Sequence, residues 1–86
     1  MNKTPEVAII PLEHGGTCTI INTYLKDEKV HRVSVYDSAR NETATVDVTN
    51  YKDAHWLYSS AVLSGHSGMA LLTIELYKLR PSAARK

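Results

Sequence analysis

The fold is decided within residues 43–63, which read TATVDVTNYKDAHWLYSSAVL. Up to Thr49 every second residue is apolar, which is the pattern of a β-strand with one buried face. After Asn50 the apolar residues recur with a period of about 3.6, which is the pattern of an amphipathic helix. We therefore predict a strand over 43–49 that is followed by a helix over 51–64. The residues that carry these patterns are Ala44, Val46 and Val48 in the strand and Ala54, Leu57, Tyr58, Ala61 and Val62 in the helix.

Residues typical of helix caps stand at both ends of the predicted helix. Asn50 is an N-cap residue type, whose side chain accepts hydrogen bonds from the first backbone N–H groups. Asp53 places a carboxylate near the positive end of the helix dipole. Gly65 follows the last apolar position, so we expect it to be the first residue beyond the helix.

Three further strand patterns precede this stretch. β-Branched and aromatic residues gather in segments 6–12, 18–25 and 30–36, as they do in strands. The connections between them are short and polar, and they read HGGT at 14–17, KDEK at 26–29 and SARNE at 38–42. Because short connections join antiparallel neighbours, we predict a four-strand antiparallel meander with the helix packed on one face.

The last segment, 69–79, carries two conflicting patterns. Its Met, Ala, Leu, Glu and Lys residues favour a helix, whereas Leu72, Ile74 and Leu76 alternate with polar residues as in a strand. We predict a fifth, C-terminal strand. The element order is then ββββαβ, which belongs to the α+β class.

Length and composition indicate one small domain. We expect the 86 residues to form a single α+β domain over 1–80, followed by a mobile basic tail over 81–86. Ten Lys and Arg against nine Asp and Glu leave a formal charge of +1, which does not favour nucleic acid as a partner. The single cysteine, Cys18, cannot form an internal disulfide, so we expect a cytoplasmic protein. The apolar run at 7–12 is too short for a membrane span, so we expect no membrane association.

Catalytic and metal-binding patterns are missing from the sequence. Residues 65–69, GHSGM, are similar to a nucleophile elbow, but Met69 stands where that motif has its last glycine. The four histidines and Cys18 show no CxxC or HxxxH spacing that would indicate zinc. We therefore expect no enzyme activity, no cofactor and no metal. The loop with His66 and Ser67 stays of interest, because a helix after it would offer N–H groups to a phosphate.

Aromatic residues supply the candidate binding surface. The strand phases predict that Tyr36 and Tyr77 project from the face of the sheet that the helix leaves open, and Trp56 lies off the apolar stripe of the helix. Tyr and Trp dominate the binding energy of many protein interfaces. We therefore predict a non-catalytic protein-binding module, an adaptor or a small inhibitor or regulator that covers a surface of a larger partner; a homodimer is an alternative use of the same face. In its small size and its lack of catalytic motifs the chain is similar to small inhibitors encoded by phages and mobile elements. The predicted partner-binding residues are Tyr36, Tyr77, Trp56, Arg32 and Tyr24.

Two other functions are open at this point. The order of four strands and a helix over 6–64 is similar to the ββββα unit of whirly and transcription-coactivator-type single-stranded DNA-binding domains, which implies a sheet face that binds nucleic acid. The stretch from Ser59 and Ser60 through Gly68 to the tail with Arg80, Arg85 and Lys86 is similar to the end of filamentous-phage single-stranded DNA-binding proteins. In that reading tyrosines stack on bases while basic side chains hold phosphates: Tyr24, Tyr36 and Tyr77, with Lys29, Arg32, Arg40, Lys78 and Arg80. The second alternative is a small molecule or nucleotide bound at a dimer interface, beside the loop 64–68.

Overall fold

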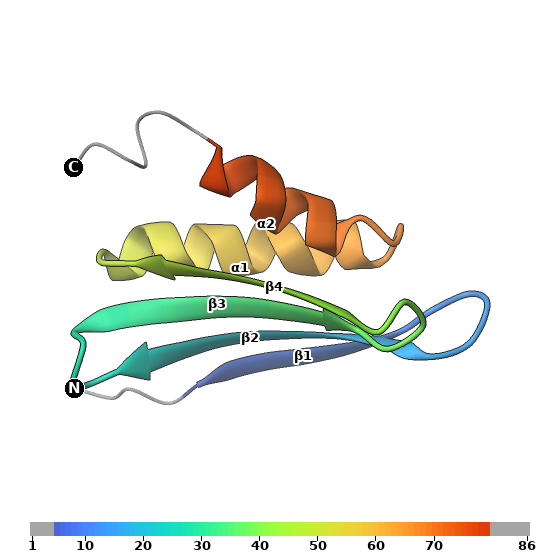
Figure 1. The fold of residues 1–86 in the computed structure, drawn as a ribbon, viewed down its shortest axis with the longest axis horizontal. Coiled ribbons are helices and arrows are strands. Elements are labelled where there is room, and N and C mark those ends of the chain that lie inside the picture. The colour runs from blue at the N-terminus through green and yellow to red at the C-terminus, as the bar shows by residue number, and fades with distance from the viewer. Residues whose placement is uncertain (1–4, 80–86) are drawn as a thin grey trace.

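The computed structural model describes residues 5–79, which form a two-layer α+β structure. A four-stranded antiparallel sheet makes one layer, and two helices cover one of its faces (Figure 1). The strands follow one another in the order β1-β2-β3-β4, as the short connections predict. The elements are β1 (Glu6–Pro11), β2 (Thr17–Leu25), β3 (Val30–Asp37), β4 (Glu42–Val48), α1 (Tyr51–Gly65) and α2 (Ala70–Lys78).

The connections between the strands fit the turn residues of the sequence. Lys29 and Asn41 adopt positive φ angles of 57° and 54°, which brings the chain back within a few residues. Gly15 and Gly16 have φ angles of 100° and 84°, a region that glycine enters without strain. These turns hold a continuous register, in which Ile20 faces Ala8 on one side and Val35 on the other.

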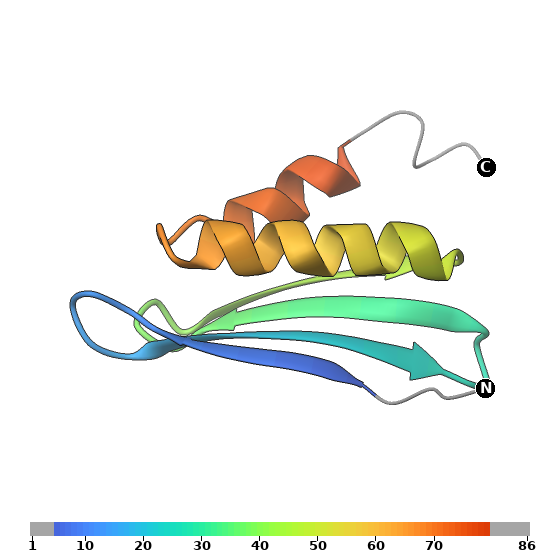
Figure 2. The same ribbon diagram turned by 180° about the vertical axis from the view of Figure 1, so that it is seen from behind.

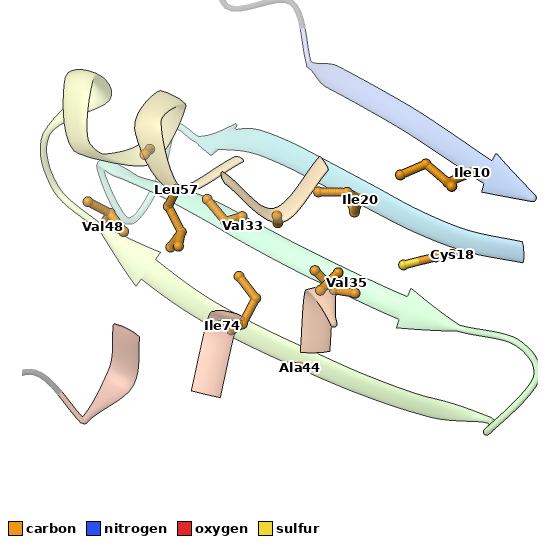
Figure 3. Packing of buried hydrophobic residues seen from close by; sticks show 12 residues of the cluster. Ile10, Cys18, Ile20, Val33, Val35, Ala44, Val48, Leu57 and Ile74 are labelled. Atoms are coloured by element: carbon orange, nitrogen blue, oxygen red, sulfur yellow. The ribbon is translucent and has the colours of Figure 1, made fainter. Parts of the chain in front are cut away.

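The core lies between the inner face of the sheet and the two helices. Its centre consists of Ile20, Val33 and Val35 from the sheet, covered by Leu57 of α1 and Ile74 of α2, and all five are fully buried (Figure 3). In β3 and β4 the inner face is the apolar face of the alternating pattern, because alternate residues of a strand share a face. In β1 the inner face carries Glu6, Ala8 and Ile10. The rest of the buried apolar cluster consists of Ile10, Cys18, Ala44, Val48, Ala54, Ala61 and Ala70.

Helix α1 begins as predicted and ends one residue later. The side chain of Asn50 accepts hydrogen bonds from the N–H groups of Lys52 and Asp53, at 2.7 and 3.4 Å. Gly65 is the last helical residue and not the first one beyond the helix. A Cβ atom at Gly65 would lie 2.6 Å from Cδ1 of Ile10, so α1 packs closely against the sheet there, and a larger residue requires the end of the Ile10 side chain to move.

The prediction of a fifth strand over 69–79 is wrong. This segment is α2, and it lies beside α1 on the same face of the sheet (Figure 2). The helix is favoured because Ala70 and Ile74, four residues apart, both become buried on one side. Thr73 adds a tie to α1 through a hydrogen bond from its Oγ1 to Oγ of Ser64 at 2.8 Å. The predicted tail at 81–86 lies outside the described residues, and so does Arg80.

Candidate functional site

The five predicted binding residues separate into three places. Tyr36 and Arg32 lie on the outer face of the sheet, which neither α1 nor α2 covers. Trp56 and Tyr77 lie in the helical layer, so the prediction that Tyr77 shares a face with Tyr36 is wrong. The reason is that 69–79 is helical and sits on the other side of the sheet. Tyr24 is half-buried on the inner face of β2, beside His31 of β3.

The outer face of the sheet is rich in hydroxyl groups. Tyr36 is 40% exposed there, and its hydroxyl donates to Oδ1 of Asn41 at 3.2 Å. Thr45 donates to Oγ of Ser34 at 3.3 Å across the β3–β4 pair. Further threonines lie on this face, because the strand register and the alternation of side chains place them on the same side as Tyr36. They are Thr17, Thr19, Thr23 and Thr43. The face is therefore mostly polar, with apolar side chains concentrated at β1.

Arg32 is engaged by acidic neighbours on that outer face. Its Nε and Nη2 donate to the two carboxylate oxygens of Asp47 at 2.7 and 3.0 Å, and Glu28 lies at 3.6 Å. The hydrogen bond from Arg32 is the main cause that lowers the pKa of Asp47. Arg32 thus stands in a two-bond pair with a carboxylate, which a phosphate would have to displace.

A row of aromatic rings runs across one end of the molecule. Tyr24, His31, Tyr51, His55 and Tyr58 follow one another with ring centroids 4.8, 5.4, 5.7 and 6.4 Å apart. The spacing of Tyr51, His55 and Tyr58 on one side of α1 is a signal that the sequence analysis missed. Its other partners come from β2 and β3, so only the fold assembles the row.

The carboxylate of Glu6, at the start of β1, contacts His55 of this row. Its Oε2 lies 2.9 Å from Nδ1 of His55, and its Oε1 accepts a hydrogen bond from Nδ2 of buried Asn22 at 2.8 Å. Burial, followed by the nearby charge of Glu6, raises the pKa of Tyr58. The arrangement joins a strand, its neighbour and a helix, which is a structural role.

The helical layer carries the largest group of exposed apolar side chains. Trp56 and Leu63 of α1 point away from the sheet, and Trp56 packs against Tyr77 of α2 with ring centroids 6.4 Å apart. Four more lie on or beside α2: Leu72 and Leu76 are four residues apart on one side of the helix, and Met69 and Leu79 flank its two ends. We call these six residues the helical surface: Trp56, Leu63, Met69, Leu72, Leu76 and Leu79, between 45% and 76% exposed.

The loop that contains His66 and Ser67 is closed by its own hydrogen bonds. The N–H groups of Ser67 and Met69 both donate to the carbonyl of Ser64, at 3.0 and 2.9 Å. The Ser67 hydroxyl donates to the same carbonyl at 2.9 Å. The loop therefore directs these donors to the end of α1.

A reactive thiol or a metal site would be built from Cys18 and from the His, Asp and Glu side chains. Cys18 is buried, and its burial, followed by the charge of Asp37, raises the pKa of the thiol, so the reactive thiolate is disfavoured. Within residues 5–79, no three His, Cys, Asp or Glu side chains gather in a group that could hold a metal ion. Neither α1 nor α2 has the length and apolar character needed to cross a membrane.

Comparison with models of protein families, with curated proteins and with solved structures finds no match to this chain. The helical surface is therefore the candidate site on physical grounds alone, because it is the largest collection of exposed apolar side chains among the described residues.

Proposed function

We propose that this chain is a non-catalytic protein-binding module whose helical surface covers an apolar site on a larger protein. The observation that carries the proposal is the exposed apolar stripe made by Leu72 and Leu76 on α2 with Met69 and Leu79 at its two ends. The fully buried residues of this nine-residue helix are Ala70 and Ile74. Contiguous exposed apolar surface on a small domain marks interaction sites.

The composition of the helical surface resembles the centre of a protein interface. Burial of a large apolar side chain contributes about 1.5–3 kcal/mol, and Trp56 beside Tyr77 adds two residue types that often dominate binding energy. Glu75 and Lys78 flank the stripe as an ion pair at 3.8 Å, which leaves little net charge around it. A partner groove lined with apolar side chains fits such a surface.

A module of this kind acts as an adaptor, or as a small inhibitor or regulator of the phage-encoded type. The buried free thiol of Cys18 fits a reducing compartment such as the cytoplasm. Single-stranded nucleic acid is the second candidate, and the geometry supports it less. Tyr36 and Tyr77 lie on opposite sides of the molecule, and two of the cations expected to hold phosphates, Arg32 and Lys78, are paired with carboxylates.

Capture from cell lysate at moderate salt, with and without nuclease, tests the proposal. We expect a stoichiometric protein companion that survives nuclease and is lost with Leu76→Asp. Trp56→Ala should weaken binding by about thirtyfold, which corresponds to about 2 kcal/mol for a central anchor.

Tyr36→Ala is the matched control, since it changes an exposed aromatic residue on the other side of the sheet. Capture that is lost with Tyr36→Ala and kept with Leu76→Asp would move the site to the outer face of the sheet. Capture of nucleic acid that disappears with salt would overturn the proposal in favour of the second candidate.

A further inference from the structure

Strand β1 presents hydrogen-bonding groups at an edge of the sheet. The N–H of Leu12 donates to the carbonyl of Gly16 at 3.0 Å, and the register continues unbroken along β1 and β2. Because antiparallel pairs alternate between bonded and non-bonded positions, the even-numbered residues of β1 bond to β2. The N–H and C=O groups of Val7 and Ile9 therefore point outward, away from the sheet.

The side chains at this edge are apolar and exposed. Val7 is 53% and Ile9 is 64% exposed, both on the outer face. The opposite edge, β4, differs: by the same alternation its outward backbone groups belong to Thr43, Thr45 and Asp47. Natural edge strands are commonly protected by charges, bulges or proline. Between Val7 and Ile10, β1 has no charged residue and no bulge.

We propose that the β1 edge pairs with β1 of a second copy, so that two chains form one continuous eight-stranded antiparallel sheet. In the symmetric register centred on Ala8, Val7 lies opposite Ile9 of the second copy, and Ile9 lies opposite its Val7. Each of these two pairs exchanges both backbone hydrogen bonds. Since residues opposite one another share a face, the same register packs the exposed Val7 and Ile9 side chains together.

Charge and proline positions favour a second copy as the occupant. The carboxylate of Glu6 is turned to Asn22 and His55, and in this register Glu6 lies opposite Ile10 of the second copy, so the two carboxylates do not meet. Pro5 and Pro11 lack an N–H group and fall opposite each other. The register therefore uses both outward donors of each chain and loses none to proline.

The dimer would place two helical surfaces on the same side. The two-fold axis of an antiparallel strand pair is perpendicular to the sheet, so both helical layers cover one face of the joined sheet. The other face becomes a continuous hydroxyl-rich surface with Val7 and Ile9 of both chains at its centre. The proposed partner would then meet two copies of the binding surface at once, which raises avidity.

The test measures the native mass of the full chain over a concentration series by sedimentation. We expect the wild type to have the mass of two chains. The control variant Thr43→Lys adds a lysine at the opposite edge, on β4, and should also have the mass of two chains. Ile9→Lys should yield a folded monomer, because the Ile9 side chain makes no core contact. Leu76→Asp should remain a dimer, which separates this interface from the helical surface.

Hydrogen exchange at single amides locates the contact. The amides of Val7 and Ile9 should exchange more slowly as the dimer forms, while those of Thr43 and Thr45 should be unchanged. A wild-type monomer at all concentrations would overturn the proposal. A dimer in which the amides of Val7 and Ile9 stay unprotected would also overturn it. So would a mass that keeps growing with concentration and that Thr43→Lys reduces to one chain, because this result indicates that β1 pairs with β4 of the next chain.

Discussion

The two helices of this protein differ in the composition of their exposed sides. Helix α1 directs Leu57 into the core and places polar residues such as Lys52 and Ser59 elsewhere. Helix α2 buries Ala70 and Ile74, yet leaves Leu72 and Leu76 exposed. The comparison teaches that the exposed side of α1 mixes polar residues with Trp56 and Leu63, whereas α2 is apolar both on the side that faces the sheet and on the side that faces away.

The largest expected effect contrasts two leucines, one from each helix. Leu57→Ala should lower the free energy of unfolding by about 2–5 kcal/mol, because Leu57 is fully buried and its loss leaves a cavity. Leu76→Ala should change it by less than about 0.5 kcal/mol, because Leu76 is 55% exposed. Urea denaturation of both variants measures the difference. Equal losses would show that the outer side of α2 is structural, which would remove the basis for the helical surface.

A smaller effect is expected where the two helices begin. Asn50→Ala should lower the free energy of unfolding by about 1 kcal/mol, because the Asn50 side chain caps two N–H groups of α1. Met69 precedes α2 without a side-chain hydrogen bond to it, so Met69→Ala should leave stability nearly unchanged. Thermal unfolding followed by circular dichroism compares the two. An Asn50→Ala variant as stable as Met69→Ala would contradict the assigned cap.

The smallest expected effect on the free energy of unfolding concerns the face of the sheet that neither helix covers. Arg32 lowers the pKa of Asp47, so the folded state favours the carboxylate. The stabilisation is present above the ordinary pKa of 3.8 and is lost as the pH falls through the lowered value in the folded state. The stability difference between wild type and Asp47→Asn should therefore shrink on acidification. Denaturation midpoints measured from pH 7 to pH 2 test this, and a difference that grows toward acid would contradict the sign.

Much of the fold could be predicted because the relevant signals are local. Alternation in β4, the turn residues around Lys29 and Asn41, and the cap at Asn50 each act within a few residues. The segment 69–79 could not be predicted in this way, because Leu72, Ile74 and Leu76 fit a strand as well as a helix. Only contact of Ala70 and Ile74 with the sheet, together with the bond between Thr73 and Ser64, favours the helix.

Less of the candidate site than of the fold could be predicted from the sequence. Trp56 was predicted to lie off the apolar stripe, and it is 53% exposed. The stripe on α2 was not recognised, because assigning 69–79 to a strand places Leu72 and Leu76 on the same face as Ile74. The row of rings from Tyr24 to Tyr58 was missed for another reason: its members are brought together from separate strands and a helix.

The sequence by itself determined the four-strand meander, the first helix and the core-facing side of β3 and β4, since periodicity and turn residues encode these locally. Tertiary structure decided the state of α2, the role of Gly65 against Ile10, and which apolar side chains remain outside. The physical reason is that a side chain's burial depends on what packs over it. With only two helices over four strands, the inner face of the sheet is filled, while the helical surface and the β1 edge remain exposed.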